Sequence, residues 1–315
     1  MAITRLSDII EPAVFAAYMR EVIPERSALI QSGIITQNSI LNDLVSGGGR
    51  TVNMPMWNDL GGEDKVMVSG GFITPDGIGT SEDIAVMHKR ENAWAAESLA
   101  SMVAGDSAMD AIGARVADWW TRMEQRVLLS TLRGVFASPT MAEHVENGTG
   151  NQIGASMILR GKQRLGDAAE QLTALFMNSR TFTRMQNLNL IDAIPNARGE
   201  ISFNTYLGYR IIVDDTVPET STYLMANGVV ARGDGLPVDL NPVAVTSDEL
   251  ASGGVEYLVH RRAFVLHPMG VAWIGTAAAA APSNTELANG ANWQRVYHPK
   301  NIGMIEIRHD VAQID

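Results

Sequence analysis

Apolar and polar residues alternate along residues 51–57. Val52, Met54 and Met56 fall on one face of an extended strand, whereas Thr51, Asn53 and Trp57 fall on the other. Pro55 favours an edge strand, because proline cannot donate a ladder hydrogen bond. With a return strand at 84–88 and a glycine-rich tip between, residues 50–90 are predicted to form a long hairpin. A hairpin with so little apolar mass is only marginally stable alone in water. We therefore expect it to lie against other protein.

Over residues 106–134, apolar residues recur at intervals of three and four. This segment predicts one amphipathic helix of roughly 40 Å, more than twice the average length and typical of a structural spine. Asp106 or Ser107 is expected to cap it, and Gly134 to end it. Arg115, Arg122 and Arg126 should be more exposed than the apolar stripe. The stripe consists of Met109, Ile112, Val116, Trp119, Trp120, Met123 and Val127.

Residues 1–45 combine short apolar clusters with helix breakers. Ile9, Val14, Tyr18 and Val22 have near-helical spacing, and Pro24 is expected to end that stretch. The glycines of 46–49 then predict a flexible joint. We therefore interpret 1–45 as an arm, and we expect residues 1–30 to be dispensable for folding of the rest.

The second half of the chain is rich in β-strand patterns. The sequence Asn-Gly-Thr-Gly at 147–150 marks a boundary, after which a helix is expected near 155–170. A buried strand at Leu172–Met177 precedes a helix capped by Asn178 or Ser179. Further strands are expected at 206–215, 222–231, 243–246, 255–266 and 271–275. The order of elements predicts an α+β protein with two lobes.

Composition narrows the class of protein. The 315 residues are 46% apolar and 19% charged, and no run reaches the ~18–20 apolar residues of a membrane span. The N-terminus lacks the layout of a signal peptide. Cysteine is absent, which excludes disulfides, thiolate nucleophiles and zinc–thiolate sites. A net charge of −11 with only four lysines argues against sequence-specific nucleic-acid binding but is compatible with enclosing nucleic acid.

No catalytic group emerges from the reactive side chains. The six histidines form no HExxH pair, and no G-x-S-x-G elbow marks a nucleophile. His267 and His298, each followed by proline, are interpreted as ends of strands. We therefore predict no catalytic, cofactor-binding or metal-binding residues and no cofactor. An unrecognised hydrolase site remains an alternative.

Four short motifs have simpler explanations than a binding site. Asp76, Ser81 and Asp83 lack the spacing of a calcium loop, so a solvated turn is expected. The glycines of 46–49 lack the lysine of a phosphate-binding loop. Arg232-Gly233-Asp234 spells an integrin-binding tripeptide, but the surrounding glycines favour a tight turn. Trp119 and Trp120 lie on a helical stripe and are expected to pack.

With these elements placed, the chain resembles the major capsid proteins of tailed bacteriophages, which have the Hong Kong 97-type fold. The most specific stretches are Phe-Met-Asn-Ser-Arg-Thr-Phe at 176–182 and Tyr-Leu-Gly-Tyr-Arg-Ile-Ile-Val-Asp-Asp at 206–215. The resemblance implies five parts. They are an N-terminal arm (1–45), an extended loop (46–92), a peripheral domain with a spine helix (93–154, helix 106–134), an axial domain (155–275), and a C-terminal segment returning to the peripheral domain (276–315).

The resemblance also implies the function. Copies of the chain would assemble into the hexamers and pentamers of an icosahedral virion shell around double-stranded DNA, in the host cytoplasm and without a membrane. Separate scaffolding, portal and decoration proteins are possible partners. Lys65 lies in the loop, but no matched asparagine or glutamate is identifiable, so the family's Lys–Asn cross-link is not transferred. An encapsulin-like nanocompartment shell around a cargo enzyme is the alternative of the same fold.

Overall fold

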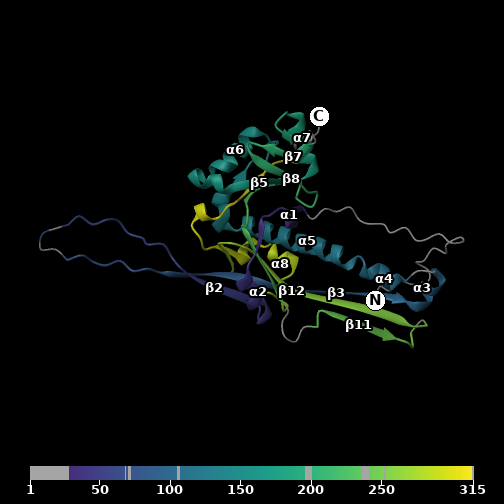
Figure 1. The fold of residues 1–315 in the computed structure, drawn as a ribbon. Coiled ribbons are helices and arrows are strands. Elements are labelled where there is room, and N and C mark those ends of the chain that lie inside the picture. The colour runs from purple at the N-terminus through teal and green to yellow at the C-terminus, as the bar shows by residue number, and fades with distance from the viewer. Residues whose placement is uncertain are drawn as a thin grey trace.

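The computed structural model describes residues 28–67, 69, 72–104, 107–195, 201–235, 241–251 and 253–313. Figure 1 shows an upper lobe, a long lower sheet, and helix α5 (Val116–Ala137) between them. A loop extends far beyond the body from the end of the lower sheet. The molecule is therefore elongated, and its two ends are exposed surfaces built from different segments.

The lower sheet has six strands in the order β1-β10-β12-β3-β2, with β11 paired to β12. Only β1 and β10 are parallel to each other. Two of the strands, β3 and β12, are long and run beside each other from residue 87 to 97 and from 255 to 265. The bounds are β1 (Ile35–Gln37), β2 (Thr51–Trp57), β3 (Thr80–Glu97), β10 (Val230–Gly235), β11 (Val243–Asp248) and β12 (Val255–Pro268).

The predicted hairpin is confirmed, with a much longer return strand. Strand β2 is an edge strand, Val52 is buried, and the opposite face is exposed, as the alternation predicts. The return strand extends beyond 84–88 because β12, more than 150 residues away in sequence, supplies its hydrogen bonds. Gly48 and Gly49 enter the hairpin with left-handed φ of 82° and 109°, which favours glycine at this joint.

The upper lobe contains a seven-stranded sheet in the order β4-β15-β9-β5-β8-β7-β6. The central strand β5 has the predicted bounds, and Asn178 caps α7 by accepting a hydrogen bond from the Arg180 N–H at 3.0 Å. The elements are β4 (Val145–Asn147), α6 (Ala155–Gln163), β5 (Leu172–Met177), α7 (Ser179–Asn187), β6 (Asp192–Pro195), β7 (Ile201–Tyr206), β8 (Tyr209–Val213), β9 (Ser221–Ala226) and β15 (Met304–Arg308).

The chain divides between the two sheets differently from the expected domains. The strand expected at 222–231 is two strands: β9 lies in the upper sheet and β10 in the lower one. Between them Gly228 has φ of 69° and approaches Thr36 so closely that a Cβ would lie 2.6 Å from Oγ1. Consequently 230–268 belongs to the lower sheet, whereas β15, from the C-terminal segment, belongs to the upper one.

The spine is not the single helix predicted for 106–134 but two helices separated by a turn. A first segment, α4 (Ala108–Gly113), is separated from α5 by a turn at Ala114 and Arg115. Ser107 caps α4 as predicted, accepting from the Asp110 N–H at 3.1 Å. Gly134 does not end the helix, which continues to Ala137. A Cβ there would lie 1.9 Å from the carbonyl oxygen of Leu287, so close packing explains the glycine.

The apolar stripe is buried mainly in the second half of α5, although Trp120 in the first half is also buried. Val127 is buried, as are Leu128 and Leu132, but Ile112, Val116 and Met123 are only half-buried, which the uniform stripe did not predict. Arg115 and Arg126 are exposed, and Arg122 is half-buried. The core residues of α5 share one cluster with side chains of both sheets. The N-terminal part of the spine instead contacts β3, and one side of it stays partly open.

Small elements complete the core. The first described helix inserts the fully buried Leu29, and the Ala28 N–H donates to Asp214 Oδ2 at 2.9 Å. Deleting residues 1–30 would therefore remove the buried side chain of Leu29 as well as the predicted arm. The patterned residues Ile9 to Pro24 lie outside the described residues. The elements are α1 (Ala28–Gln31), α2 (Ser39–Ser46), α3 (Ser98–Ala104), β13 (Val271–Trp273), α8 (Asn284–Leu287) and β14 (Trp293–Arg295).

In the part of the chain that the structure describes, four short 3-10 helices connect these elements. They span Pro139–His144, Gly166–Gln171, Gly290–Asn292 and Pro299–Asn301. The second follows α6, where one continuous helix was expected near 155–170. His298 accepts a hydrogen bond from the Lys300 N–H at 3.3 Å, so its predicted role at a turn is confirmed.

Candidate assembly surfaces

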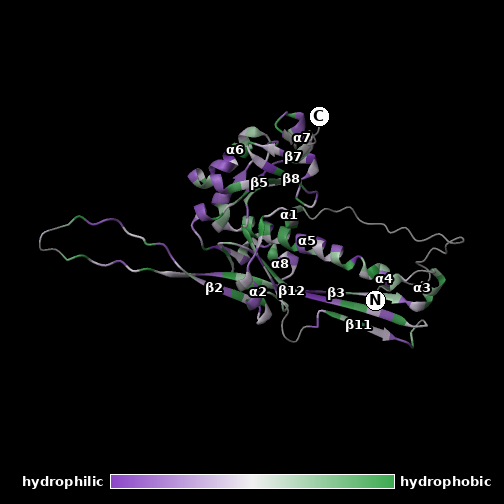
Figure 2. Cartoon of the chain, viewed as in Figure 1, coloured by the Kyte–Doolittle hydropathy of each residue, from purple (hydrophilic) through white to green (hydrophobic). Residues whose placement is uncertain are grey.

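The projecting loop carries the largest set of exposed apolar side chains. Figure 2 shows apolar stretches along it, although it has no core of its own. Met67 is 93% exposed, and its neighbours in the loop are similarly uncovered. Exposed apolar surface of this kind marks an interaction site in a soluble protein. The residues are Trp57, Leu60, Val66, Met67, Phe72, Ile73 and Ile78.

Few internal contacts hold the loop. The Lys65 ammonium lies 3.1 Å from Asp76 Oδ2 and donates to the Thr74 carbonyl oxygen at 2.6 Å. Both charged side chains are about half exposed, so this ion pair contributes at most about 1 kcal/mol. At the base, the Asn58 N–H donates to the Gly79 carbonyl oxygen at 2.9 Å. The loop is closed at its base, and its tip depends on outside contacts for a fixed position.

The opposite end of the molecule exposes a second apolar group. Helix α3 presents Leu99, Met102 and Val103, and Leu250 in the turn between β11 and β12 is 99% exposed. These segments are adjacent, because Ser98 N–H donates to the Gly254 carbonyl oxygen at 2.9 Å. Apolar surface therefore lies at both ends of the long axis, as in a subunit that contacts others at each end.

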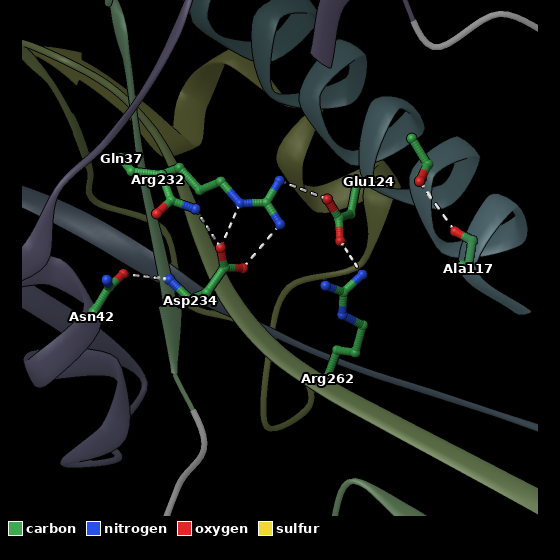
Figure 3. A network of polar contacts seen from close by, with 8 residues as sticks. Gln37, Asn42, Ala117, Glu124, Arg232, Asp234 and Arg262 are labelled. Atoms are coloured by element: carbon green, nitrogen blue, oxygen red, sulfur yellow. Dashed lines mark hydrogen bonds and ion pairs between the residues drawn. The ribbon is translucent and has the colours of Figure 1, made fainter. Parts of the chain in front are cut away.

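A buried ionic network joins helix, sheet and N-terminal segment. The Glu124 carboxylate on α5 is 3% exposed and accepts from Arg232 Nη1 at 2.8 Å and from Arg262 Nη1 at 2.5 Å (Figure 3). Arg232 also donates to Asp234 at 2.6 and 2.9 Å. Burial alone would lower the pKa of Arg232. The hydrogen bonds that Arg232 donates to Asp234 and Glu124 outweigh the effect of burial, so the pKa of Arg232 is raised. The network fixes α5 on β10 and β12.

This network corrects the interpretation of Arg232-Gly233-Asp234 as a tight turn. All three residues lie in β10, and Gly233 packs so tightly on α2 that a Cβ would lie 2.6 Å from Leu41 Cβ. The Arg232 guanidinium is 13% exposed and engaged by carboxylates. The tripeptide is therefore a structural element, and its sequence alone gave no sign of the distant partner Glu124.

The histidines are dispersed through the fold. His144 Nδ1 lies 2.9 Å from the Met304 carbonyl oxygen, and His309 Nε2 lies 2.9 Å from Thr222 Oγ1. Burial lowers the pKa of both rings. His267, inside β12, has Nε2 at 3.0 Å from Asp83 Oδ1. Asp83 is itself buried in β3, so the solvated turn expected at 76–83 is wrong for this residue.

His88 provides a pH dependence. Burial, reinforced by Arg90, lowers its pKa from 6.5 to about 3. As pH falls, His88 therefore takes up a proton in the unfolded chain at a higher pH than in the folded chain. The folded state loses stability as pH falls from 6.5 towards 3. At pH 5 the loss is roughly 2 kcal/mol. We expect His88→Leu to remove about that much of the difference in unfolding free energy between pH 7.5 and pH 5, measured with urea.

A turn histidine supplies the control for this prediction. His298→Gln, which changes an exposed histidine at the turn before Pro299–Asn301, is the variant to measure alongside it. A His88→Leu subunit with the same pH dependence as the unchanged chain would contradict the prediction.

The tryptophan pair packs inside the fold. Trp119 contacts Trp94 and Trp120 edge-on, with ring centroids 5.2 and 4.9 Å apart. Trp120 is 2% exposed and lies beside His260. These rings therefore pack against other side chains, as predicted.

No reactive centre gathers in the part of the chain that the structure describes. Within it, no three histidine, aspartate or glutamate side chains lie together as metal ligands. The same residues contain no helix that is both long and apolar enough to span a membrane. The features that stand out are exposed apolar ends and an internal network that stiffens the body.

Comparisons with known proteins agree on one class. The sequence model of a family described as Gp13-like, major capsid protein 13-like, matches residues 87–302. The chain is 37% identical to the major capsid protein of Bacillus phage SPP1, over 98% of this chain and 99% of that protein. Their lengths and order of segments therefore correspond almost throughout.

Solved structures show the same fold at much lower identity. The capsid asymmetric unit of cyanophage Pam1 matches with a TM-score of 0.62 and 11% identity, over 97% of each chain. A chain from Mycobacterium phage Che8 matches with a TM-score of 0.56 and 10% identity, over 94% of this chain and 96% of that one. At these identities the likeness concerns the fold.

Proposed function

Because this chain belongs to the Gp13-like family of major capsid proteins, we propose that its hexamers and pentamers close into an icosahedral shell around double-stranded DNA. The chain is a structural subunit of a phage virion and not an enzyme, so the hydrolase alternative is wrong. Its fold is the Hong Kong 97-type capsid fold that the resemblance predicts.

The exposed apolar loop is the observation that carries the proposal. It leaves the body between Trp57, the last residue of β2, and Thr80, the first residue of β3, which pair with each other. Within the described residues, the side chains of Met67 and Ile73 are 93% and 78% exposed. Lying across an adjacent subunit would bury them and fix the loop. Association of many copies is the simplest way to satisfy such a surface.

We assign the domains of the capsid fold according to which of the two sheets each strand belongs to. The seven-stranded sheet with α6 and α7 would be the axial domain. The six-stranded sheet with α5 would be the peripheral domain, and 58–79 the extended loop. The segment 1–27 would be the arm. This assignment replaces the continuous ranges 93–154, 155–275 and 276–315 with domains built from separate segments.

The charge of the chain fits a container for DNA. A net charge of −11 repels phosphates, so packaged DNA would not stick to the wall. Assembly is proposed to occur in the host cytoplasm, with separate scaffolding, portal and decoration proteins as candidate partners. A nanocompartment shell would share the fold but enclose an enzyme, and the family membership favours the virion.

Electron microscopy of the purified protein tests this function. We expect closed polyhedral particles in which the loop resists a protease that cuts it in the free subunit. Nuclease-protected double-stranded DNA in particles from infected cells would support a virion shell, whereas a copurifying enzyme would support the nanocompartment. A chain that stays monomeric under all conditions, or a loop cut equally fast in both states, would count against the proposal.

A further inference from the structure

Strand β11 forms an open edge of the six-stranded sheet. Figure 1 shows it at the outer side of β12, away from the body. Within the described residues it pairs only with β12. Its side chains are mostly exposed, and Val245 is 64% exposed. An edge strand presents unpaired N–H and C=O groups, so this strand can accept another strand.

The hydrogen-bond pattern identifies which groups are free. Val243 lies opposite His260, so Pro242 lies opposite Arg261, whose N–H donates to the Pro242 carbonyl oxygen at 2.8 Å. In an antiparallel pair, hydrogen-bonded residues alternate with residues that point away. Ala244, Thr246 and Asp248 therefore bond to β12, and the N–H and C=O groups of Val243, Val245 and Ser247 point outward.

Nothing in β11 blocks this edge. Natural edge strands are usually protected by lysine, proline, a bulge or an inward charge. Residues 243–247 are Val-Ala-Val-Thr-Ser, which contain none of these residue types. The register with β12 is continuous from Val243 to Asp248, so no bulge twists the strand away. The open edge is therefore both accessible and apolar.

An arginine lies at one end of the strand, and carboxylates lie at the other. Beside Pro242, Arg261 donates from Nη1 to the Asn241 carbonyl oxygen at 3.4 Å, while its Nε lies 3.2 Å from Glu91. At the other end are the exposed Asp248, Glu249 and Glu256. A second copy of β11, placed antiparallel, would bring its acidic end to the Arg261 end of the first. An antiparallel copy would thus find a guanidinium beside its acidic end, although Arg261 is already paired with Glu91.

We propose that β11 pairs antiparallel with β11 of a second copy, across a two-fold axis between Val245 and its equivalent. This register matches Val243 with Ser247 of the copy and therefore satisfies every outward-facing group of the strand. The two exposed Val245 side chains would pack against each other. The inference rests on the proposed shell, in which the pair would join subunits of adjacent rings and continue one sheet through both.

A single cysteine tests the register, because the chain contains no cysteine. Opposed residues of a hydrogen-bonded pair have Cα atoms about 5.5 Å apart, within the range of about 4.4–6.8 Å that a disulfide spans. Particles assembled from V245C and treated with a mild oxidant should give mostly covalent dimers on a non-reducing gel. Each chain has one partner, so nothing larger should form.

Val243→Cys is the matched control. In the proposed register, Val243 of one copy faces Ser247 of the other. The two Val243 residues are therefore offset by four residues, or about 14 Å along the strands. We expect at least about tenfold less dimer from this variant, because a disulfide cannot span that distance. The double variant V243C/S247C should cross-link again, since each cysteine then faces its partner.

The outcomes separate this inference from the proposed function. Normal particles whose V245C thiols stay freely reactive with maleimide would mean an open edge. Thiols that are protected without forming dimers would mean that another polypeptide covers β11. Equal cross-linking of V245C and V243C would mean a loose contact without this register. Each result overturns the β11 pair while the shell stands, whereas failure to form any particle challenges the shell itself.

Discussion

Gly134→Ala is expected to lower the free energy of unfolding of the isolated subunit by roughly 2–4 kcal/mol. The added Cβ would lie 1.9 Å from the Leu287 carbonyl oxygen and 2.6 Å from Trp293 Nε1. These two atoms already bond to each other at 2.7 Å, and the indole is buried, so neither can retreat cheaply. Separation of α5 from α8 is the expected relief, and it would expose core.

Gly113→Ala provides the matched control in the same spine. No atom lies within 4 Å of a Cβ built at Gly113. Alanine is the better helix former, so this change should be neutral or stabilise by up to about 1 kcal/mol. Urea unfolding of both variants, followed by circular dichroism, measures the difference. Equal stabilities for the two variants would refute the packing explanation for Gly134.

Replacing residues 59–78 of the loop by Asn-Gly is expected to abolish particles while the subunit still folds. A two-residue turn closes on a hydrogen-bonded pair, and at the base of the loop this pair is Asn58 and Gly79, whose N–H and carbonyl oxygen lie 2.9 Å apart. The described residues among those replaced make contacts only near the base and within the loop itself. If the loop holds neighbouring subunits, its loss removes that contact and leaves the core intact. Sedimentation measures particle yield, and circular dichroism checks the fold.

Two variants of full loop length refine this result. Phe72→Ser with Ile73→Ser keeps the length but removes exposed apolar area, and should strongly reduce particle yield. Lys65→Ala removes only an exposed ion pair worth at most about 1 kcal/mol, and should assemble normally. Undiminished particles from the Asn-Gly chain would show that the loop is dispensable for assembly.

The buried network has a consequence for the shell as a whole. Glu124 is held by arginines from β10 and β12, and Asp234 also accepts from Gln37 Nε2 at 3.3 Å. The helix, the lower sheet and the segment after residue 28 thus form one stiff body. Breaking a buried ion pair leaves an uncompensated charge.

Local chemistry let the sequence determine several elements by itself. The alternation at 51–57 specified both the strand and its buried face, because successive side chains point to opposite sides. Strand Leu172–Met177 and the Asn178 cap followed from a short apolar run and one capping side chain. The pattern also indicated that the hairpin at 50–90 has too little apolar mass to be stable alone, but not that its loop exposes large apolar side chains.

Distant partners decided the rest. The sequence could not show that β3 continues to Glu97, since β12 supplies the hydrogen bonds. Gly134 has the pattern of a helix end, and only the approach of Leu287 makes it an interior position. Arg232 and Asp234 resemble a turn until Glu124 is placed beside them. The sequence determined that segments such as 51–57 and 172–177 form strands and that most of 108–134 is helical, whereas tertiary packing decided element lengths, the sheets they join, short strands such as β15, and which glycines are fixed by contact.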